Sequence, residues 1–186
     1  MCSKAKRILE QLSEEEKKII TEKIGEADGL KTSEEASYIN KLLEEVEVYH
    51  IDTCSAMRQC GACCLEKDVV EEAKKLYQKA SNTEDFLTLL NEAGIGGNHL
   101  RLEGNKILAT YEECYCDTPK KVDAMHAKYC ECSAGWYQSL FSEVLKKRVN
   151  VKIIDTKGAI STLCFDDLLS HYSFVDGTPF GIKEEK

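Results

Sequence analysis

Glu112-Glu113-Cys114-Tyr115-Cys116, continued by Tyr129-Cys130-Glu131-Cys132-Ser133-Ala134-Gly135-Trp136, is the stretch where the sequence changes from a strand pattern to a helix pattern. Residues before it alternate between apolar and polar, and residues after it repeat with helical spacing. Two Cys-x-Cys pairs, 13 residues apart, therefore stand at the joint between a strand and a helix. Four thiols at such a joint indicate a binding site, and a bound metal is the interpretation that the sequence favours.

The pattern on either side of this stretch predicts two β-hairpins. Leu100 to Tyr111 alternates around a Gly104-Asn105 turn, which suits a tight hairpin. Val149 to Phe165 repeats the pattern, with Asp155-Thr156-Lys157-Gly158 as the expected turn. A helix over 136–145 separates the two hairpins. The sequence therefore predicts an α+β fold in which hairpin, helix and hairpin form a four-stranded antiparallel sheet with helices on one face.

The N-terminal half is expected to be helical, starting at residue 3. Ser13 to Glu16 and Thr32 to Glu35 have the spacing of capping boxes, which mark helix starts. Apolar residues at helical spacing give these helices one face to bury. We expect residues 1–50 to form a helical segment packed on an α+β, Cys-rich, ligand-binding domain over 51–186, the two making one compact unit.

Two further helices are expected before the first hairpin. One spans Leu65 to Ala80, and a shorter one follows the cap Ser81-Asn82-Thr83. The glycines of Gly94-Ile95-Gly96-Gly97-Asn98 follow a helix and precede a strand, whereas a dinucleotide fingerprint follows a strand and opens a helix. These glycines are therefore predicted to form a helix stop and turn.

Composition narrows the class of protein. The chain has 186 residues and a net charge of −8, with acidic and basic residues interleaved. No basic stripe of the kind that binds nucleic acid is visible, and no apolar run approaches the roughly 20 residues of a membrane span. The N-terminal apolar stretch is too short for a signal peptide. We expect a cytoplasmic protein with a small-molecule partner, and leave open whether it acts as a homodimer.

In a reducing compartment the ten cysteines are expected to be thiols, used in metal or redox chemistry rather than disulfides. Cys114 with Cys116, and Cys130 with Cys132, could each point two sulfurs to one place, because residues i and i+2 share a face in extended chain. Four thiolates would close a tetrahedral zinc site; an iron–sulfur cluster is the alternative cofactor. One cysteine of each pair could also ligate together with His126 or Cys164. Reactive thiols and buried, unliganded thiols stay open.

A second cysteine cluster precedes the hairpins. Cys54, Cys60, Cys63 and Cys64 lie within eleven residues, and the last three would share a helix face. They could ligate a metal, cycle as redox thiols, or simply pack as small hydrophobic side chains.

Tyr129 to Tyr137, with Phe141, the strand Val149-Asn150-Val151 and Cys164-Phe165, resembles the 4-vinyl-reductase type of protein and the related group named for L-2-amino-thiazoline-4-carboxylic acid hydrolase. The resemblance covers roughly residues 85–166. It implies an antiparallel sheet with a buried ligand pocket, a small-molecule-binding role, a metal, and a hydrolase or reductase activity. No catalytic residue carries over from it.

Three functions follow as hypotheses. The first is a small-molecule-binding or sensor domain with a cysteine-ligated zinc ion. The second is a hydrolase of a small cyclic amide or thiazoline-type substrate, using a metal-bound water or a thiolate. The third is a thiol redox protein in which Cys60, Cys63 and Cys64 cycle. The sequence leaves the catalytic residues unknown and the question of enzyme activity open.

Overall fold

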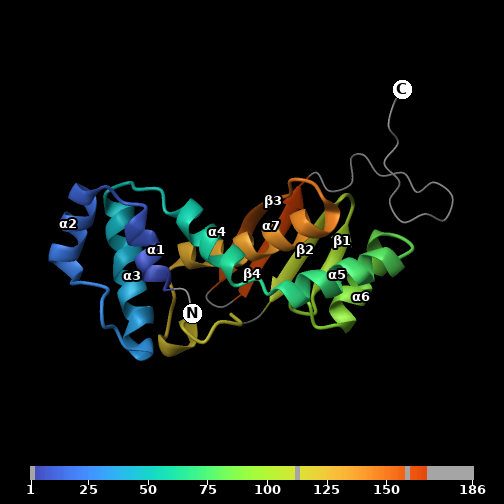
Figure 1. The fold of residues 1–186 in the computed structure, drawn as a ribbon, viewed down its shortest axis with the longest axis horizontal. Coiled ribbons are helices and arrows are strands. Elements are labelled where there is room, and N and C mark those ends of the chain that lie inside the picture. Colours follow the sequence, from blue (N-terminus) through green and yellow to red (C-terminus); the bar gives the residue numbers. More distant parts are fainter. Residues whose placement is uncertain (1–2, 112–113, 158–159, 167–186) are drawn as a thin grey trace, which may run out of the picture.

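The computed structural model describes residues 3–111, 114–157 and 160–166, and these form an elongated molecule with helices at one end and a sheet at the other (Figure 1). The α+β class and the helical first half are confirmed, and helix predominates over strand. The helices are α1 (Lys4–Glu10), α2 (Glu14–Ile24), α3 (Thr32–Val48), α4 (Cys54–Cys63), α5 (Lys67–Lys79), α6 (Thr83–Glu92) and α7 (Glu131–Leu145). The strands are β1 (Leu100–Glu103), β2 (Lys106–Tyr111), β3 (Asn150–Lys157) and β4 (Ile160–Asp166). Short 3-10 turns span Pro119–Lys121 and Ala127–Cys130.

Local capping chemistry sets the start of the N-terminal helices. The first predicted capping box is confirmed, because the Ser13 backbone N–H donates to the Glu16 carboxylate at 2.8 Å and the Glu16 N–H donates to the Ser13 hydroxyl at 3.3 Å. The second box is wrong by one residue. Thr32 is already helical, so the Lys31 N–H donates to the Glu34 carboxylate at 3.0 Å.

The strands pair antiparallel in the order β1-β2-β4-β3, so the last strand, β4, lies between β2 and β3. The turn predicted at residues 155–158 is wrong, because β3 continues through Lys157, which pairs with Ile160; Gly158 lies outside the described residues. The β3–β4 register shifts between Ile153 and Asp155, and Ile154 is left 58% exposed. An extra residue on one strand is a β-bulge, which moves every position beyond it by one.

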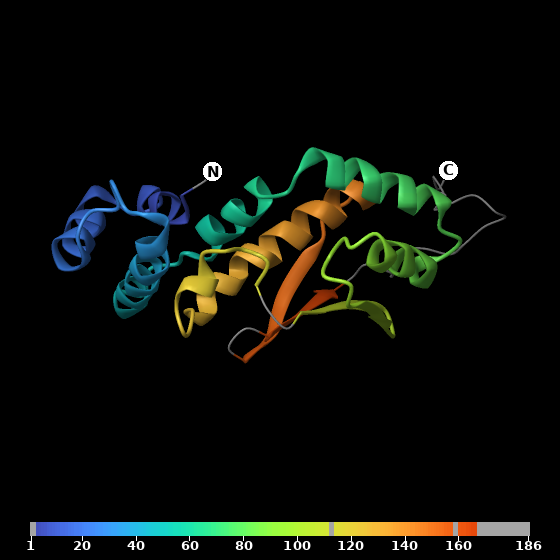
Figure 2. The same cartoon turned by 90° about the horizontal axis from the view of Figure 1, so that it is seen from below.

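Buried apolar residues form two clusters. The first core joins α1, α2 and α3 to Ala56, Met57 and Cys60 of α4 and to Tyr129 and Cys132. The second core lies between the strands and helices α5, α6 and α7, which cover one face of the sheet (Figure 2). Since α4 contributes to the first core and packs along α7, residues on both sides of position 50 share one core. The division of the chain near residue 50 stays a prediction.

The crossing of α4 and α7 brings their backbones into direct contact. A Cβ added at Gly61 would overlap the Cys132 carbonyl, and one added at Gly135 would overlap the Arg58 backbone. The Arg58 guanidinium fixes the crossing: it donates to the Glu131 carboxylate at 2.7 Å, to the Gln138 side-chain oxygen at 2.9 Å and to the β3 backbone at 3.0 Å. The first turn of α7 is thereby held against α4.

Among the described helices, none has the length and apolarity needed to cross a membrane.

Candidate functional site

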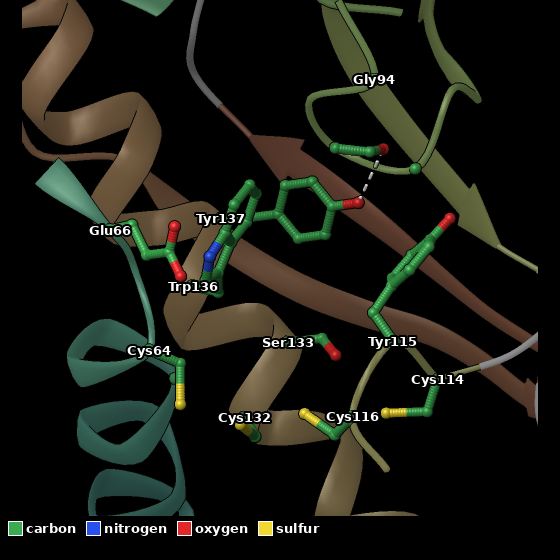
Figure 3. A pocket seen from close by; sticks show the side chains of 13 residues that line it. Cys64, Glu66, Gly94, Cys114, Tyr115, Cys116, Cys132, Ser133, Trp136 and Tyr137 are labelled. Atoms are coloured by element: carbon green, nitrogen blue, oxygen red, sulfur yellow. Dashed lines mark hydrogen bonds between the residues drawn. The ribbon is translucent and has the colours of Figure 1, made fainter. Parts of the chain in front are cut away.

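A pocket of about 410 Å³ opens where the end of α4, the α6–β1 loop, the segment 114–116 and the first turns of α7 meet (Figure 3). The glycines predicted to form a helix stop and turn do so, and three of them contribute backbone to the wall. The lining residues are Gly61, Cys64, Glu66, Gly94, Gly96, Gly97, Cys114, Tyr115, Cys116, Cys132, Ser133, Trp136 and Tyr137. The pocket therefore collects residues that are up to 76 positions apart in the sequence, from Gly61 to Tyr137.

Three thiols meet at the floor of this pocket: Cys114, Cys116 and Cys132, which we call the thiol trio. The sulfur of Cys114 points toward Cys116, and Cys132 lies on the other side of Cys116 (Figure 3). The thiols of Cys114 and Cys132 both hydrogen-bond the Cys116 sulfur. Cys116 is therefore the acceptor at the centre of the trio.

A buried lysine lies behind the floor of the pocket, next to Cys116. Lys4 of α1 is only 7% exposed, and its Nζ lies 4.0 Å from the Cys116 sulfur and 5.4 Å from the centre of the Tyr129 ring. Burial alone would lower the pKa of Lys4, but its interactions with Cys132, Tyr129 and Cys116 outweigh burial and raise that pKa. An ammonium ion is therefore held next to the sulfur of Cys116.

Hydrogen bonding and charge distribute the protons within the trio. Thiol donation from Cys114 and Cys132, followed by the charge of Lys4, holds the pKa of Cys116 well below that of an ordinary thiol. The same hydrogen bonds, together with burial, raise the pKa of Cys114 and of Cys132. These shifts favour a thiolate on Cys116 and leave the protons on Cys114 and Cys132.

The two Cys-x-Cys pairs behave differently because their backbones differ. Cys114 and Cys116 bring their sulfurs to one place, although the chain bends at residues 115–116 and is not the extended chain on which the prediction rested. The expectation that Cys130 and Cys132 do so is wrong, since Cys130 ends a 3-10 turn and Cys132 lies in the first turn of α7. Residues i and i+2 do not face each other on a helix. Cys132 joins the trio, while the half-buried Cys130 acts on Cys114 through its charge.

The structure separates the second cysteine cluster. Cys60 is buried in the first core, Cys63 is exposed, and Cys64 is exposed at the edge of the pocket. Cys54 lies at the start of α4, where burial, followed by the nearby carboxylates of Glu131 and Asp52, raises the pKa of its thiol to about 11. The cluster is thus spread over a core, a surface and a pocket wall, and its proposed ligand and redox roles stay predictions.

His126 lies against α3 and away from the thiols. Its Nε2 lies 3.1 Å from the Glu47 carboxylate, and its Nδ1 accepts from the Lys128 N–H at 3.2 Å. Its own backbone N–H donates to the Asn40 side chain at 2.9 Å. These contacts tether the segment before α7 to α3.

Cys164 pairs in register with Leu108 of β2 and Lys152 of β3. Without the bulge near Ile154, the two-residue connection between Lys157 and Ile160 would place Cys164 opposite Ile153. With the bulge, Cys164 instead pairs with Lys152, which lies between Val151 and Ile153 on β3. Its side chain lies outside the described part of the structure, so its predicted role as a ligand is untested.

The described residues contain no group of three histidine, cysteine, aspartate or glutamate side chains arranged to hold a metal ion. The sulfurs of the trio instead form a hydrogen-bonded chain. The predicted zinc site at Cys114, Cys116, Cys130 and Cys132, and the iron–sulfur alternative, stay predictions.

Sequence reasoning missed several residues of this site. Lys4 reaches the thiols through the packing of α1 against α3 and α4, and Tyr129 through the 3-10 turn before α7; no local pattern marks either residue. Gly96 accepts a hydrogen bond from the Tyr137 hydroxyl at 3.0 Å through its carbonyl. The sequence signal that could have indicated this pocket wall is the pair of consecutive glycines, Gly96 and Gly97. Both have positive φ in the structure, and glycine loops of this kind allow close approach of backbone to a ligand.

The chain belongs to the DUF6144 family, a family of unknown function, whose model matches residues 3–173. This match corrects the resemblance to the 4-vinyl-reductase type and the thiazoline-carboxylate hydrolase group. That resemblance rested on residues 85–166 alone, whereas the family match includes the helical half and the pocket residues from both halves. No curated protein matches the chain, and no solved structure does.

Proposed function

We propose that this protein is a small-molecule-binding domain that presents the sulfur of Cys116 to a ligand in the pocket. The observation that carries the proposal is the convergence of three thiols at the floor of a cavity of about 410 Å³, with the buried Lys4 behind Cys116. Cavities of this size accommodate small organic ligands. A cluster that served packing alone would have no need of a buried ammonium group, because burying a charge is costly unless it is paired.

The chemistry available to such a sulfur follows from its charge. A thiolate, not a thiol, is the nucleophile and the soft ligand. Cys114 and Cys132 keep the negative charge on Cys116 by donating to it, and Lys4 balances that charge inside the protein. The site is therefore suited to contact an electrophilic or soft centre of a bound molecule.

Alkylation by iodoacetamide, in which the thiolate displaces iodide and forms a thioether, tests this proposal. We expect the rate constant at Cys116, followed by peptide mapping, to change less than about threefold between pH 8 and pH 5.5. An ordinary thiol with a pKa of about 8.5 loses nearly tenfold in rate for each pH unit in that range. The slope of the profile is the readout, because thiolates of low pKa are also weaker nucleophiles.

Glutathione measured in parallel supplies the reference slope, and Cys116→Ser should remove the labelled peptide. A Cys116 profile as steep as that of glutathione would contradict the proposal, since it would mean that the sulfur is protonated at neutral pH.

A metal ion held by the trio is the second candidate function, favoured by the fact that members of both Cys-x-Cys pairs meet at one place. Zinc prefers thiolate ligands, and Cys130, which interacts electrostatically with Cys114, is the candidate for a fourth sulfur. We expect protein purified without added metal to contain about one equivalent of zinc, and a chelator to release the trio for alkylation. Less than a tenth of an equivalent, with alkylation unchanged by chelator, would eliminate this candidate.

A further inference from the structure

The wall of the pocket opposite the thiols is aromatic. Trp136 and Tyr137 of α7 pack edge to face, with ring centres 5.1 Å apart and planes at 87°. The hydrogen bond from the Tyr137 hydroxyl to the Gly96 carbonyl fixes the second ring. Tyr115 is 66% exposed, and its ring points from the Cys114–Cys116 segment toward the glycine loop (Figure 3).

Tyr115 is placed at the mouth of the pocket by the missing side chain of Gly97. A Cβ at Gly97 would lie 2.9 Å from the Tyr115 hydroxyl oxygen. The aromatic ring therefore approaches the loop as closely as glycine permits. Together the three rings border the cavity on two sides.

Among the lining residues, the ionisable carboxyl group is that of Glu66. Glu66 supplies a carboxylate at the rim, and the described lining residues include no lysine or arginine. Lys4 lies behind Cys116 and is directed at that sulfur, so its charge is offset there. The partial positive charge at the start of α7 is faced by Glu131, which pairs with Arg58 at 2.7 Å, and by the trio itself.

Aromatic faces and a carboxylate are the groups that recognise organic cations. The negative face of an aromatic ring attracts an ammonium group that has lost part of its hydration, and quaternary ammonium ligands are bound in this way. An anionic ligand would meet Glu66 without a cation in the lining to balance it. A purely apolar ligand would fill the volume but gain nothing from the carboxylate.

We infer that the pocket selects an organic ammonium ion carrying an aromatic or apolar group, held between Tyr115, Trp136 and Tyr137 with its positive charge toward Glu66. The inference rests on the proposed small-molecule-binding function and specifies the class of ligand.

Three probes of similar size test the selection: phenyltrimethylammonium, N,N-dimethylaniline, which is uncharged at pH 8, and benzenesulfonate. We expect calorimetry on the reduced full chain at pH 8 to give at least tenfold tighter binding of phenyltrimethylammonium than of either other probe. Trp136 is the single tryptophan of the chain, so a saturable change in its fluorescence on adding the cation would place binding in this pocket.

The substitution Glu66→Gln tests whether the pocket recognises the charge of the probe or only its shape. It should weaken phenyltrimethylammonium binding by about threefold or more and leave N,N-dimethylaniline binding unchanged. Glu71→Gln is the matched control, because Glu71 lies on the exposed face of α5 and pairs with Lys74 at 2.9 Å; it should change neither.

Equal binding of the three probes, tighter binding of benzenesulfonate, or no binding of the cation at 10 mM would each overturn the inference. The flat alkylation profile of Cys116 is independent of these titrations. A flat profile without cation selectivity would therefore refute the ligand class alone, whereas a steep profile would refute the thiolate role.

Discussion

Gly135→Ala is expected to lower the free energy of unfolding by more than about 3 kcal/mol, measured by urea denaturation followed by circular dichroism. The Cβ would overlap the backbone of Arg58, and neither helix can move away without breaking the contacts of the Arg58 guanidinium. Gly61→Ala should act similarly, because its Cβ would overlap the Cys132 carbonyl. Backbone atoms cannot be relieved by a rotamer change, so the strain falls on the whole α4–α7 crossing.

Gly29→Ala is the control for this prediction. Gly29 has φ +77° and nothing within 4 Å of an added Cβ, so the substitution reports the backbone cost alone, of about 1 kcal/mol. A loss at Gly135 no larger than the loss at Gly29 would show that α4 and α7 do not cross in close backbone contact.

Lys4→Met is expected to slow alkylation of Cys116 at pH 5.5 by roughly 10- to 100-fold while leaving the rate at pH 9 nearly unchanged. Methionine keeps the volume of the buried chain but removes the charge 4.0 Å from the sulfur. The pKa of Cys116 should rise, and the pH profile should become steep. Lys6→Met on the same helix is the matched control, since Lys6 is exposed and pairs with Asp28.

The same substitution should change how stability depends on pH. Because the pKa of Cys116 is lowered in the folded state, its contribution is complete above the pKa of an unfolded thiol and is lost as pH falls through the folded value. Lys4→Met should therefore flatten the dependence of stability on pH over the range below about 8.5. Identical alkylation profiles for Lys4→Met and the unmodified protein would contradict the role given to Lys4.

Local sequence patterns predicted the elements that local chemistry controls. The Ser13–Glu16 box starts α2 because both partners lie within one turn, and Asn82 starts α6 by accepting from the Asp85 N–H at 2.8 Å. The hairpin at Gly104 follows from alternation and a turn residue. The placement of Cys114 beside Cys116 also follows from spacing. The error of one residue at Lys31 arises because Glu34 and Glu35 are neighbours and either could accept from a backbone N–H at the start of α3.

What the sequence by itself determined is therefore the helices other than α4, the first hairpin and the concentration of thiols at the start of α7. Only the tertiary structure decided which thiols meet, and with which partner charge. The 3-10 turn before α7 separates Cys130 from Cys132, the bulge near Ile154 sets the register of Cys164, and the packing of α1 brings Lys4 to a sulfur 112 residues away. Contacts at that separation depend on how cores close and backbones cross, and no short stretch of sequence encodes them.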